Sequence, residues 1–416
     1  MSCENRLKFC KRCLYSTYHP FGLILDEDGV CSGCLIHEEK YKLDWADRFE
    51  KLKKITKQYR SKNGNNYDCI VPVSGGSDSY FIVDVVKNRL NLNPLLVSYN
   101  KYWNTEIGIW NLANLRTIFD CDILFQNVNP KSVKKIVSNT LSEFGSIYWH
   151  CIAGQTVFPV QTSVLNKIPL IIWGAHQGIE QVGMFSHESE VEMTRRYRKD
   201  HDLIDKEADD LVTIFNNLKE EDIFQYRYPS DFDLNAVGVR GIYLSNFIPW
   251  DPIAQHEEMI KKYNFRTKKF DRTFDCYDFV DCNNYMEIHD ILKLFKHGYS
   301  KVTDHVCREI RHGRINRAQG ISLVRYYEQV KVKGLNQFAS WLGTTSNSLK
   351  WIMDTHRNKL YWKEIDYRNW SFYGMSSKFD EDSIDKVPVD YIEPVQNYHN
   401  LDKDENNYII FGKGHP

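Results

Sequence analysis

The chain has 416 residues, 42% of them hydrophobic, and is long enough for two or three domains with sizeable cores. Its 54 Lys and Arg residues balance 55 Asp and Glu residues, and the resulting net charge of -1 does not favour a surface committed to nucleic acid. No apolar run reaches the length of a membrane span. The 11 cysteines form no disulfide framework, so the sequence predicts a soluble protein of a reducing cytoplasm.

Two pairs of cysteines near the N-terminus have the spacing of a metal site. Cys10 and Cys13 form one C-x-x-C knuckle, and Cys31 and Cys34 form a second. Two such knuckles can place four thiolates tetrahedrally around one Zn²⁺. Because sulfur would fill every position, no site is left for water, and we expect a structural zinc. The alternative is a pair of disulfides in a secreted protein, which the scattered remaining cysteines do not favour.

Residues 43–58 are charged, with apolar residues at helical spacing, and this pattern predicts a linking helix. Residues 61–66, rich in Asn, Ser and Lys, break the pattern. We therefore expect a zinc-binding module with its linker helix over residues 1–60 and a second domain from residue 61.

Strand-like and helical patterns alternate from residue 67 onward. The predicted strands are 68–73, 94–99, 121–126 and 168–173, and the predicted helices are 79–90, 105–119, 130–143 and 155–167. Such alternation predicts an α/β domain with a parallel sheet that carries its ligands at the carboxyl ends of the strands. We assign this domain to residues 61–200. For residues 201–416 we expect a mainly helical region that binds substrate or a partner.

The turn after the first predicted strand is rich in glycine and serine: Ser74, Gly75, Gly76, Ser77, Asp78 and Ser79. The glycines let the backbone approach phosphate oxygens closely, the hydroxyls can donate hydrogen bonds, and the following helix begins with a positive end. Asp78 would be repelled by phosphate, so it is expected to meet Mg²⁺ or water, or to act as a helix N-terminal charge. No Walker-type or dinucleotide glycine motif is present. An ordinary glycine-rich turn with a Ser or Asp cap is the alternative.

Other candidate site residues follow later strands or lie near the C-terminus. Ser98 and Tyr99 end the second strand, and His176 and Gln177 follow the last one. In a helix over 303–312, charged and histidine side chains share one face and can grip a sugar acid or a diphosphate: Asp304, His305, Arg308, Arg311 and His312. The alternative is a solvated face with an ordinary Asp–Arg pair.

The 74–79 turn resembles the pyrophosphate loop of the ATP pyrophosphatase (PP-loop) superfamily, whose enzymes split ATP into AMP and pyrophosphate. Together with the four cysteines, it makes most of the chain resemble the PseA/WbpG-like N-acetyl sugar amidotransferase family. The resemblance also includes residues 149–154, 168–174, 296–317 and 373–379. Ala175 and His176 stand where the family carries Glu and Asn, so the sugar is expected to differ, with His176 or Gln177 replacing the Glu.

The resemblance implies that ATP activates a sugar N-acetyl group and that ammonia then converts it to an acetamidino group, in lipopolysaccharide O-antigen or nonulosonic acid biosynthesis. It implies catalytic roles for Ser77 and Asp78, and ATP contacts from residues 74–79, Ser98 and Tyr99. The implied substrate contacts are His176, Gln177, Glu180, Lys296, Asp304, His305, Arg308 and Arg311. The implied cofactors are ATP, Mg²⁺ and structural Zn²⁺.

The implied partners are an N-acetylated sugar, either nucleotide-linked or a nonulosonic acid, and a source of ammonia. The chain shows no recognisable Cys-His-Glu glutaminase domain. A glutaminase subunit and a channel-forming subunit, like those of histidine biosynthesis, are therefore expected. Neither a nucleic acid nor a membrane span is expected.

Two other functions are compatible with these motifs. A tRNA-thiolating PP-loop enzyme would use the same ATP loop, and some such enzymes carry zinc knuckles. That class usually needs a broad basic face and often further paired cysteines, yet Cys151, Cys276, Cys282 and Cys307 form no C-x-x-C. The non-enzymatic alternative is a zinc-binding module fused to a degenerate nucleotide fold, but the turn retains every group that the chemistry needs.

Overall fold

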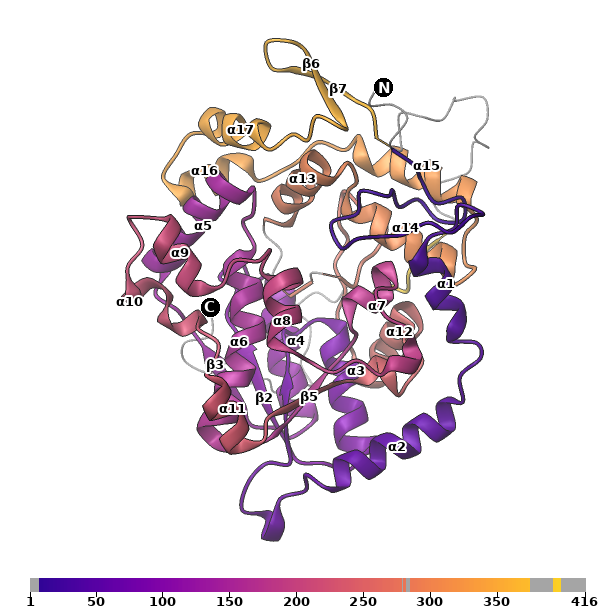
Figure 1. Ribbon diagram of the computed structural model, residues 1–416, viewed down its shortest axis with the longest axis vertical. Coiled ribbons are helices and arrows are strands. Elements are labelled where there is room, and N and C mark those ends of the chain that lie inside the picture. Colours follow the sequence, from indigo (N-terminus) through magenta and orange to yellow (C-terminus); the bar gives the residue numbers. More distant parts are fainter. Residues whose placement is uncertain (1–6, 279, 282–284, 375–391, 398–416) are drawn as a thin grey trace.

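A five-stranded parallel sheet forms the centre of the computed structural model, which describes residues 7–278, 280–281, 285–374 and 392–397 (Figure 1). Its strand order is β3-β2-β1-β4-β5. The strands are β1 (Cys69–Pro72), β2 (Pro94–Tyr99), β3 (Ile123–Gln126), β4 (Leu170–Trp173) and β5 (Arg240–Tyr243). This order reverses direction between β1 and β4, and ligands of open parallel sheets bind in the crevice at that switch point. The predicted α/β class is confirmed.

Helices cover both faces of the sheet, which explains why its strands are short apolar runs rather than alternating ones. Val71 of β1 belongs to a core under α3 (Ser77–Asp84), α4 (Glu106–Ile118) and α12 (Pro252–Tyr263). The neighbouring Ile70 belongs to a smaller core on the opposite face, under α6 (Trp149–Asn166). Successive residues of a strand point to opposite faces, so β1 serves both cores.

Strand β5 is a fifth sheet strand that the sequence pattern does not predict. It pairs with β4 from Leu170 opposite Arg240 to Trp173 opposite Tyr243. The strand has only four residues, of which one is Arg and one Gly, so it carries little β signal. The sheet therefore extends beyond residue 200, into the region that we expected to be mainly helical, and the domain boundary at that position stays a prediction.

The N-terminal module lies beside C-terminal helices rather than apart from them (Figure 1). Its helix α1 (Ser32–Glu39) leads to α2 (Trp45–Lys57), whose first N–H groups are capped by Asp44. The cysteines share a core with α14 (Lys301–Arg311) and α15 (Arg317–Glu328). The module is thus packed against residues almost 300 positions away in the sequence.

The C-terminal part is mainly helical, as predicted, and contributes to a core of its own with α5 (Pro130–Phe144). Its further elements are α13 (Met286–His297), α16 (Leu335–Leu342), α17 (Ser346–Thr355) and the antiparallel hairpin β6 (Trp362–Asp366) and β7 (Asn369–Phe372). Short helices join β4 to β5: α7 (Gln177–Val182), η4 (His187–Ser189), α8 (Arg195–Tyr197), η5 (Arg198–Asp202), α9 (Ala208–Ile214), α10 (Glu220–Ile223), η6 (Phe224–Tyr226) and α11 (Asp231–Val237). Elsewhere, η2 spans Lys62–Gly64, η3 Val85–Arg89 and η7 Leu244–Asn246.

Among the described residues, no helix has both the length and the apolar character that crossing a membrane requires. Of the segment 373–379, residues 375–379 lie outside the described residues.

Candidate active site and metal centre

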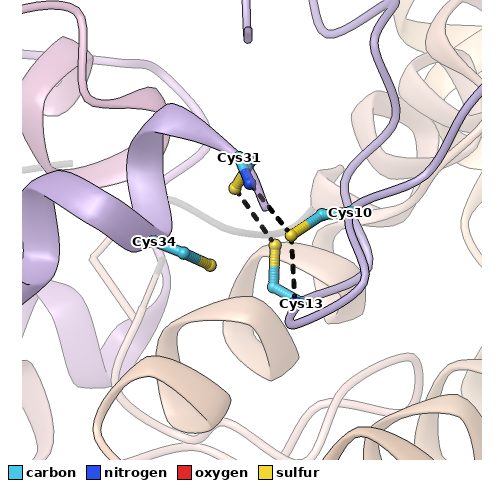
Figure 2. A group of neighbouring side chains, drawn as sticks. All are labelled: Cys10, Cys13, Cys31 and Cys34. Carbon is cyan, nitrogen blue, oxygen red and sulfur yellow. Dashed lines mark hydrogen bonds between the residues drawn. The ribbon is translucent and has the colours of Figure 1, made fainter. Parts of the chain in front are cut away.

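The four N-terminal cysteines converge on one point (Figure 2). All are buried, and their sulfur atoms lie within 4.8 Å of one another. The Sγ atom of Cys10 accepts hydrogen bonds from the N–H groups of Cys13 at 3.3 Å and Cys31 at 3.2 Å. Hydrogen bonds from the neighbouring cysteines, that from Cys13 above all, lower the pKa of Cys10 and favour its thiolate. Four clustered sulfurs with N–H donors fit a closed, structural Zn²⁺ site.

Arg311, predicted as a substrate contact, lies against this cysteine cluster instead. Its Nη2 atom is 3.7 Å from Cys31 Sγ, and its Nη1 atom donates to the Glu180 carbonyl at 2.8 Å. A side chain at position 33 would collide with the guanidinium, so the second knuckle needs Gly33. Zn²⁺ with four thiolates carries a net charge of about -2, which a buried guanidinium offsets.

The turn between β1 and α3 has the form of an anion-binding loop. Gly75 has φ +78°, and a Cβ there would lie 2.9 Å from the Gly108 carbonyl, so only glycine fits. The N–H of Ser74 is bonded to Ser79 Oγ at 3.0 Å and does not face a ligand. The N–H groups of Ser77 and Asp78 open α3, where a helix leaves its first N–H groups without intrahelical partners, and Gly76 supplies no side-chain cap.

These open N–H groups lie after β1, beside the switch point of the sheet, where the positive end of the α3 dipole adds to their attraction for an anion. The Ser77 side chain is buried, whereas that of Asp78 is 46% exposed. The two predicted catalytic residues are therefore neighbours at the mouth of the loop, and Asp78 is free to meet solvent or a cation.

Two side-chain pairs that sequence reasoning missed flank this loop. His256 of α12 places Nε2 3.0 Å from Asp78 Oδ1, and its Nδ1 has no hydrogen-bond partner among the described residues. Lys101, two residues after β2, places Nζ 2.6 Å from Asp281 Oδ2. The other oxygen of Asp281 would be 3.8 Å from a Cβ at Gly76. No local pattern marks these residues, because each pair joins segments more than 170 positions apart.

The predicted adenosine contacts Ser98 and Tyr99 are buried. The Tyr99 hydroxyl is bonded to His150 Nδ1 at 3.0 Å and to the Tyr226 hydroxyl at 2.8 Å. Burial raises the pKa of Tyr99 well above its ordinary value. The ring packs so closely on Gly154 that no side chain fits there, which gives the 149–154 segment a structural role. A nucleotide can therefore meet Tyr99 only through its backbone.

The side chains of His176 and Glu180 are engaged in contacts within the protein. His176 caps α7 by accepting the Ile179 N–H at Nδ1, and burial lowers the pKa of His176 to about 4. Glu180 pairs with Lys40 of the N-terminal module at 2.6 Å. Gln177, at the start of α7, is exposed. His176 thus caps the short helix that carries Gln177 and Glu180, and of the three side chains that of Gln177 is the most exposed.

The charged residues of α14 are engaged in buried pairs rather than forming an open cationic face. Asp304 accepts the Tyr15 hydroxyl at 2.8 Å and pairs with Lys293 and Lys301. Arg308 pairs with Asp275 at 2.6 Å. These pairs correct the expectation that the α14 cations together grip an anion, because each of them already has a carboxylate, carbonyl or thiolate partner.

Lys296 of α13 is not beside the α14 pairs either. It donates from Nζ to the Phe144 carbonyl at 2.7 Å, and burial lowers its pKa. This contact ties α13 to the end of α5. Of the predicted substrate residues near the C-terminus, His305 alone lines the cavity described next.

A cavity of about 290 Å³ lies beside this network. His305 forms part of its wall, held by Thr273 Oγ1 at 2.6 Å on Nδ1 and by Asp278 Oδ2 at 2.9 Å on Nε2. Lys301 lines the same wall. Lys268 also lines the cavity, has no ion-pair partner among the described residues, and has its pKa lowered by burial. Lys269 lines the cavity as well and likewise has no ion-pair partner among the described residues, so the cavity combines fixed hydrogen-bonding groups with two such lysines, features that suit a polar ligand.

Comparison with known proteins supports the C-terminal part most directly. Residues 257–376 match the family model described as "LPS biosynthesis protein WbpG-like, C-terminal domain". Every residue that lines the cavity falls within that segment. This part of the chain is therefore similar to a lipopolysaccharide biosynthesis domain.

Two further proteins are similar to parts of the chain. An uncharacterized protein of Methanocaldococcus jannaschii, MJ1599, is 26% identical over 121 residues, which are 28% of this chain and 42% of that relative. The chain thus matches less than half of that relative's length. The NH3-dependent NAD synthetase of Campylobacter jejuni, solved with a nitrate ion, matches 55% of this chain and 99% of its own at 12% identity. Its TM-score of 0.27 is too low to carry an argument.

Proposed function

We propose that the chain is an ATP-dependent amidotransferase that converts the N-acetyl group of a sugar into an acetamidino group, in surface glycan biosynthesis. One observation carries the proposal. An anion-binding loop at the switch point of a parallel sheet lies close to a polar cavity, and every residue lining that cavity belongs to the segment similar to a lipopolysaccharide biosynthesis domain. The loop serves the nucleotide, and the cavity serves the sugar.

Two described aspartates relate the two sites to each other. Asp278 lines the cavity, and Asp281, three positions further on, borders Gly76 of the loop. A ligand in the cavity therefore lies within a few residues' length of a nucleotide phosphate in the loop. This proximity supports a reaction between the two ligands.

The reaction needs an activated amide, because an amide oxygen is a poor leaving group. The amide oxygen attacks the α-phosphorus of ATP, the bond to the β-phosphate oxygen breaks, and pyrophosphate leaves. Ammonia then attacks the activated carbon, the carbon–oxygen bond breaks, AMP departs with the oxygen, and loss of a proton leaves the amidine. The N–H groups of Ser77 and Asp78 would stabilise the charge that develops on pyrophosphate.

The side chains at the loop have separate tasks in this scheme. The Ser77 and Ser74 hydroxyls would donate to phosphate oxygens, and Asp78 would hold a Mg²⁺, whose charge would offset that of the phosphates. His256 orients the Asp78 carboxylate through its 3.0 Å contact. Zn²⁺ in the cysteine cluster is assigned a structural role, with Arg311 as its neighbouring cation.

The cavity would hold the sugar, either nucleotide-linked or as a nonulosonic acid. Phe270 and Met286 supply apolar surface for a ring, while Thr273, Asp278 and Gln337 supply hydrogen-bonding groups. Both forms of the sugar carry an anionic group, which Lys268 can meet. We further propose that a glutaminase and a channel-forming subunit deliver the ammonia.

Pyrophosphate release tests this function. The purified chain is mixed with ATP, an N-acetylated sugar of either form and an ammonium salt, and release is expected only when all three are present. Ser77→Ala and Asp78→Asn are each expected to lower turnover by roughly 10²- to 10³-fold, because each removes part of the charge stabilisation. Asp47→Asn is the matched control, since Asp47 is also in the first turn of a helix but is exposed on α2.

Turnover with tRNA in place of the sugar would reject the assignment. Full activity of both loop variants would remove the loop from the mechanism. In either case the zinc content of the variants should equal that of the wild type, since neither residue contacts the cysteine cluster.

A further inference from the structure

Lys101 and Asp281 form a buried ion pair at the mouth of the phosphate loop. Their side chains are 11% and 6% exposed, and Nζ lies 2.6 Å from Oδ2. Lys101 follows β2 at the carboxyl edge of the sheet, the same edge at which β1 enters the loop. Asp281 Oδ1 would be 3.8 Å from a Cβ at Gly76, and Lys101 contacts the other oxygen of the same carboxylate. The Asp281 carboxylate therefore lies between the lysine ammonium and the loop.

This arrangement is unfavourable for a loop that binds only anions. A carboxylate beside Gly76 repels phosphate oxygens, and the repulsion is strong where solvent is largely excluded. The ammonium on the far side of the same carboxylate attracts them. When a polyphosphate occupies the loop, the most favourable rearrangement turns Lys101 from Asp281 toward a phosphate oxygen.

The pair also explains how a buried lysine is tolerated before the nucleotide arrives. An unpaired ammonium at this depth would be costly, and the 2.6 Å contact with Asp281 offsets that cost. The lysine is thereby held near the loop in one orientation. Such preorganisation lowers the cost of ordering its long side chain at the moment of binding.

We infer that Lys101 is a pyrophosphate-binding residue of the proposed ATP site, and that Asp281 competes with the phosphate for it. The inference rests on the proposed function, because it assumes that the loop holds the β- and γ-phosphates of ATP. Lys101, 22 positions beyond Ser79 in the sequence, thus becomes a cation of the loop. The two members of the ion pair should have opposite effects on the affinity for pyrophosphate: Lys101 raises it and Asp281 lowers it.

The test is a calorimetric titration of inorganic pyrophosphate into the zinc-loaded full chain in magnesium-free buffer. Asp281→Asn is expected to bind pyrophosphate several times more tightly than the wild type, because the competitor has lost its charge. Lys101→Met is expected to bind about tenfold more weakly or worse, the usual value of a charge-assisted hydrogen bond. Lys54→Met, on the exposed surface of α2, is the matched control and should not change binding.

A double-mutant cycle keeps the inference falsifiable if Lys101→Met destabilises the chain by leaving Asp281 unpaired. Lys101→Met should weaken binding more in the Asp281→Asn background than in the wild type, because the carboxylate charge that competes with phosphate for the lysine is gone. If the pair were only structural, the double variant would instead recover the affinity that the single lysine variant lost.

Weaker or unchanged binding by Asp281→Asn would overturn the inference, as would an unchanged Lys101→Met. If Asp281 were a Mg²⁺ ligand, Asp281→Asn would weaken binding only when Mg²⁺ is added and leave magnesium-free binding unchanged, which also overturns it. A wild type that binds neither pyrophosphate nor ATP would reject the proposed function itself, so the two failures are distinct.

Discussion

Two clusters of side chains in this protein have the atoms to hold a metal ion, and their surroundings differ. The cysteine cluster brings four sulfurs within 4.8 Å of one another, and Asp275, Asp278 and His305 bring two carboxylates and an imidazole equally close. The sulfurs of the cysteine cluster are approached by backbone N–H groups and by the guanidinium of Arg311, while Arg317 donates to the carbonyls of Cys10 and Cys13. Its combined negative charge as thiolates is left for a metal to neutralise.

The acid–histidine cluster, which consists of Asp275, Asp278 and His305, is already neutralised by protein groups. Arg308 pairs with Asp275 at 2.6 Å, and Lys301 lies 3.6 Å from Asp278. The other Asp275 oxygen accepts the Asp278 N–H at 2.8 Å. Proximity of ligand atoms is therefore insufficient for a metal site when cations and N–H groups occupy their lone pairs. The cysteine cluster is suited to zinc, and the acid–histidine cluster is a rigid wall of the cavity.

The largest expected effect comes from breaking the cysteine cluster. Cys13→Ser removes one of four thiolates from a closed site, so the variant should lose its zinc and much of the stability of the N-terminal module, since binding energy of this kind is folding energy. Metal analysis and thermal unfolding measure both. Cys121→Ser, at a half-buried cysteine outside the cluster, is the control and should retain about one zinc. A Cys13→Ser variant with full zinc content would contradict the assignment.

An intermediate effect is expected from removing a cation of the acid–histidine cluster. Arg308→Met leaves Asp275 buried and unpaired, which should lower the free energy of unfolding by about 3–5 kcal/mol without changing the zinc content. Arg12→Met is the control, because the exposed pair of Arg12 with Glu38 is worth at most about 1 kcal/mol. A metal ion bound by Asp275, Asp278 and His305 in the wild-type chain would contradict the comparison of the two clusters.

The same variant should change the response to acid. Burial opposes the charge of Asp275, but His305 and Arg308 lower its pKa below the ordinary value. A depressed carboxyl pKa contributes stability that is present above the ordinary value of about 4 and is lost as the pH falls through that region. Without Arg308 the pKa of Asp275 moves back toward the ordinary value, so the stability lost on acidification should be smaller in Arg308→Met than in the wild type. Denaturant unfolding at several pH values measures the difference.

The smallest effect is expected at the open side of the cavity. Lys268→Met removes a cation from the cavity wall and should raise the KM for the sugar by about tenfold with little change in kcat, because the contact is made equally in the ground and transition states. Since burial lowers the pKa of Lys268, wild-type KM should rise with pH earlier than an ordinary lysine would allow. The Lys268→Met variant should lack this rise. A change confined to kcat would place Lys268 at the chemistry instead of at the sugar.

The features predicted correctly from sequence are those whose residues are close together in the chain. Each cysteine knuckle occupies four successive positions and the 74–79 turn occupies six, so their spacing alone carries the local geometry, whereas the phosphate-binding role of the turn stays a prediction. Alternation of apolar runs likewise indicates the parallel sheet, since each strand–helix unit is local. The helix predicted over 79–90 corresponds to α3 together with the π-helical turn Val85–Arg89, which continues α3 directly.

The features missed are those made by contacts between distant segments. His256 is an unremarkable position in α12 until α12 packs beside α3, and Asp281 gains meaning only beside Gly76. The helical spacing of Asp304, Arg308 and Arg311 is real, but their partners come from the N-terminal module and from residues 275–293, which spacing within one helix cannot show. The wall of the cavity could not be predicted from sequence for the same reason, because its residues come from several separate segments.

The nucleotide products formed by the wild-type chain test the central claim most directly. With ATP, an N-acetylated sugar and ammonium present, chromatography should show AMP and pyrophosphate in equal amounts, with one acetamidino sugar formed for each AMP. Formation of ADP and phosphate under the same conditions would contradict the claim that the loop after β1 holds pyrophosphate as a leaving group.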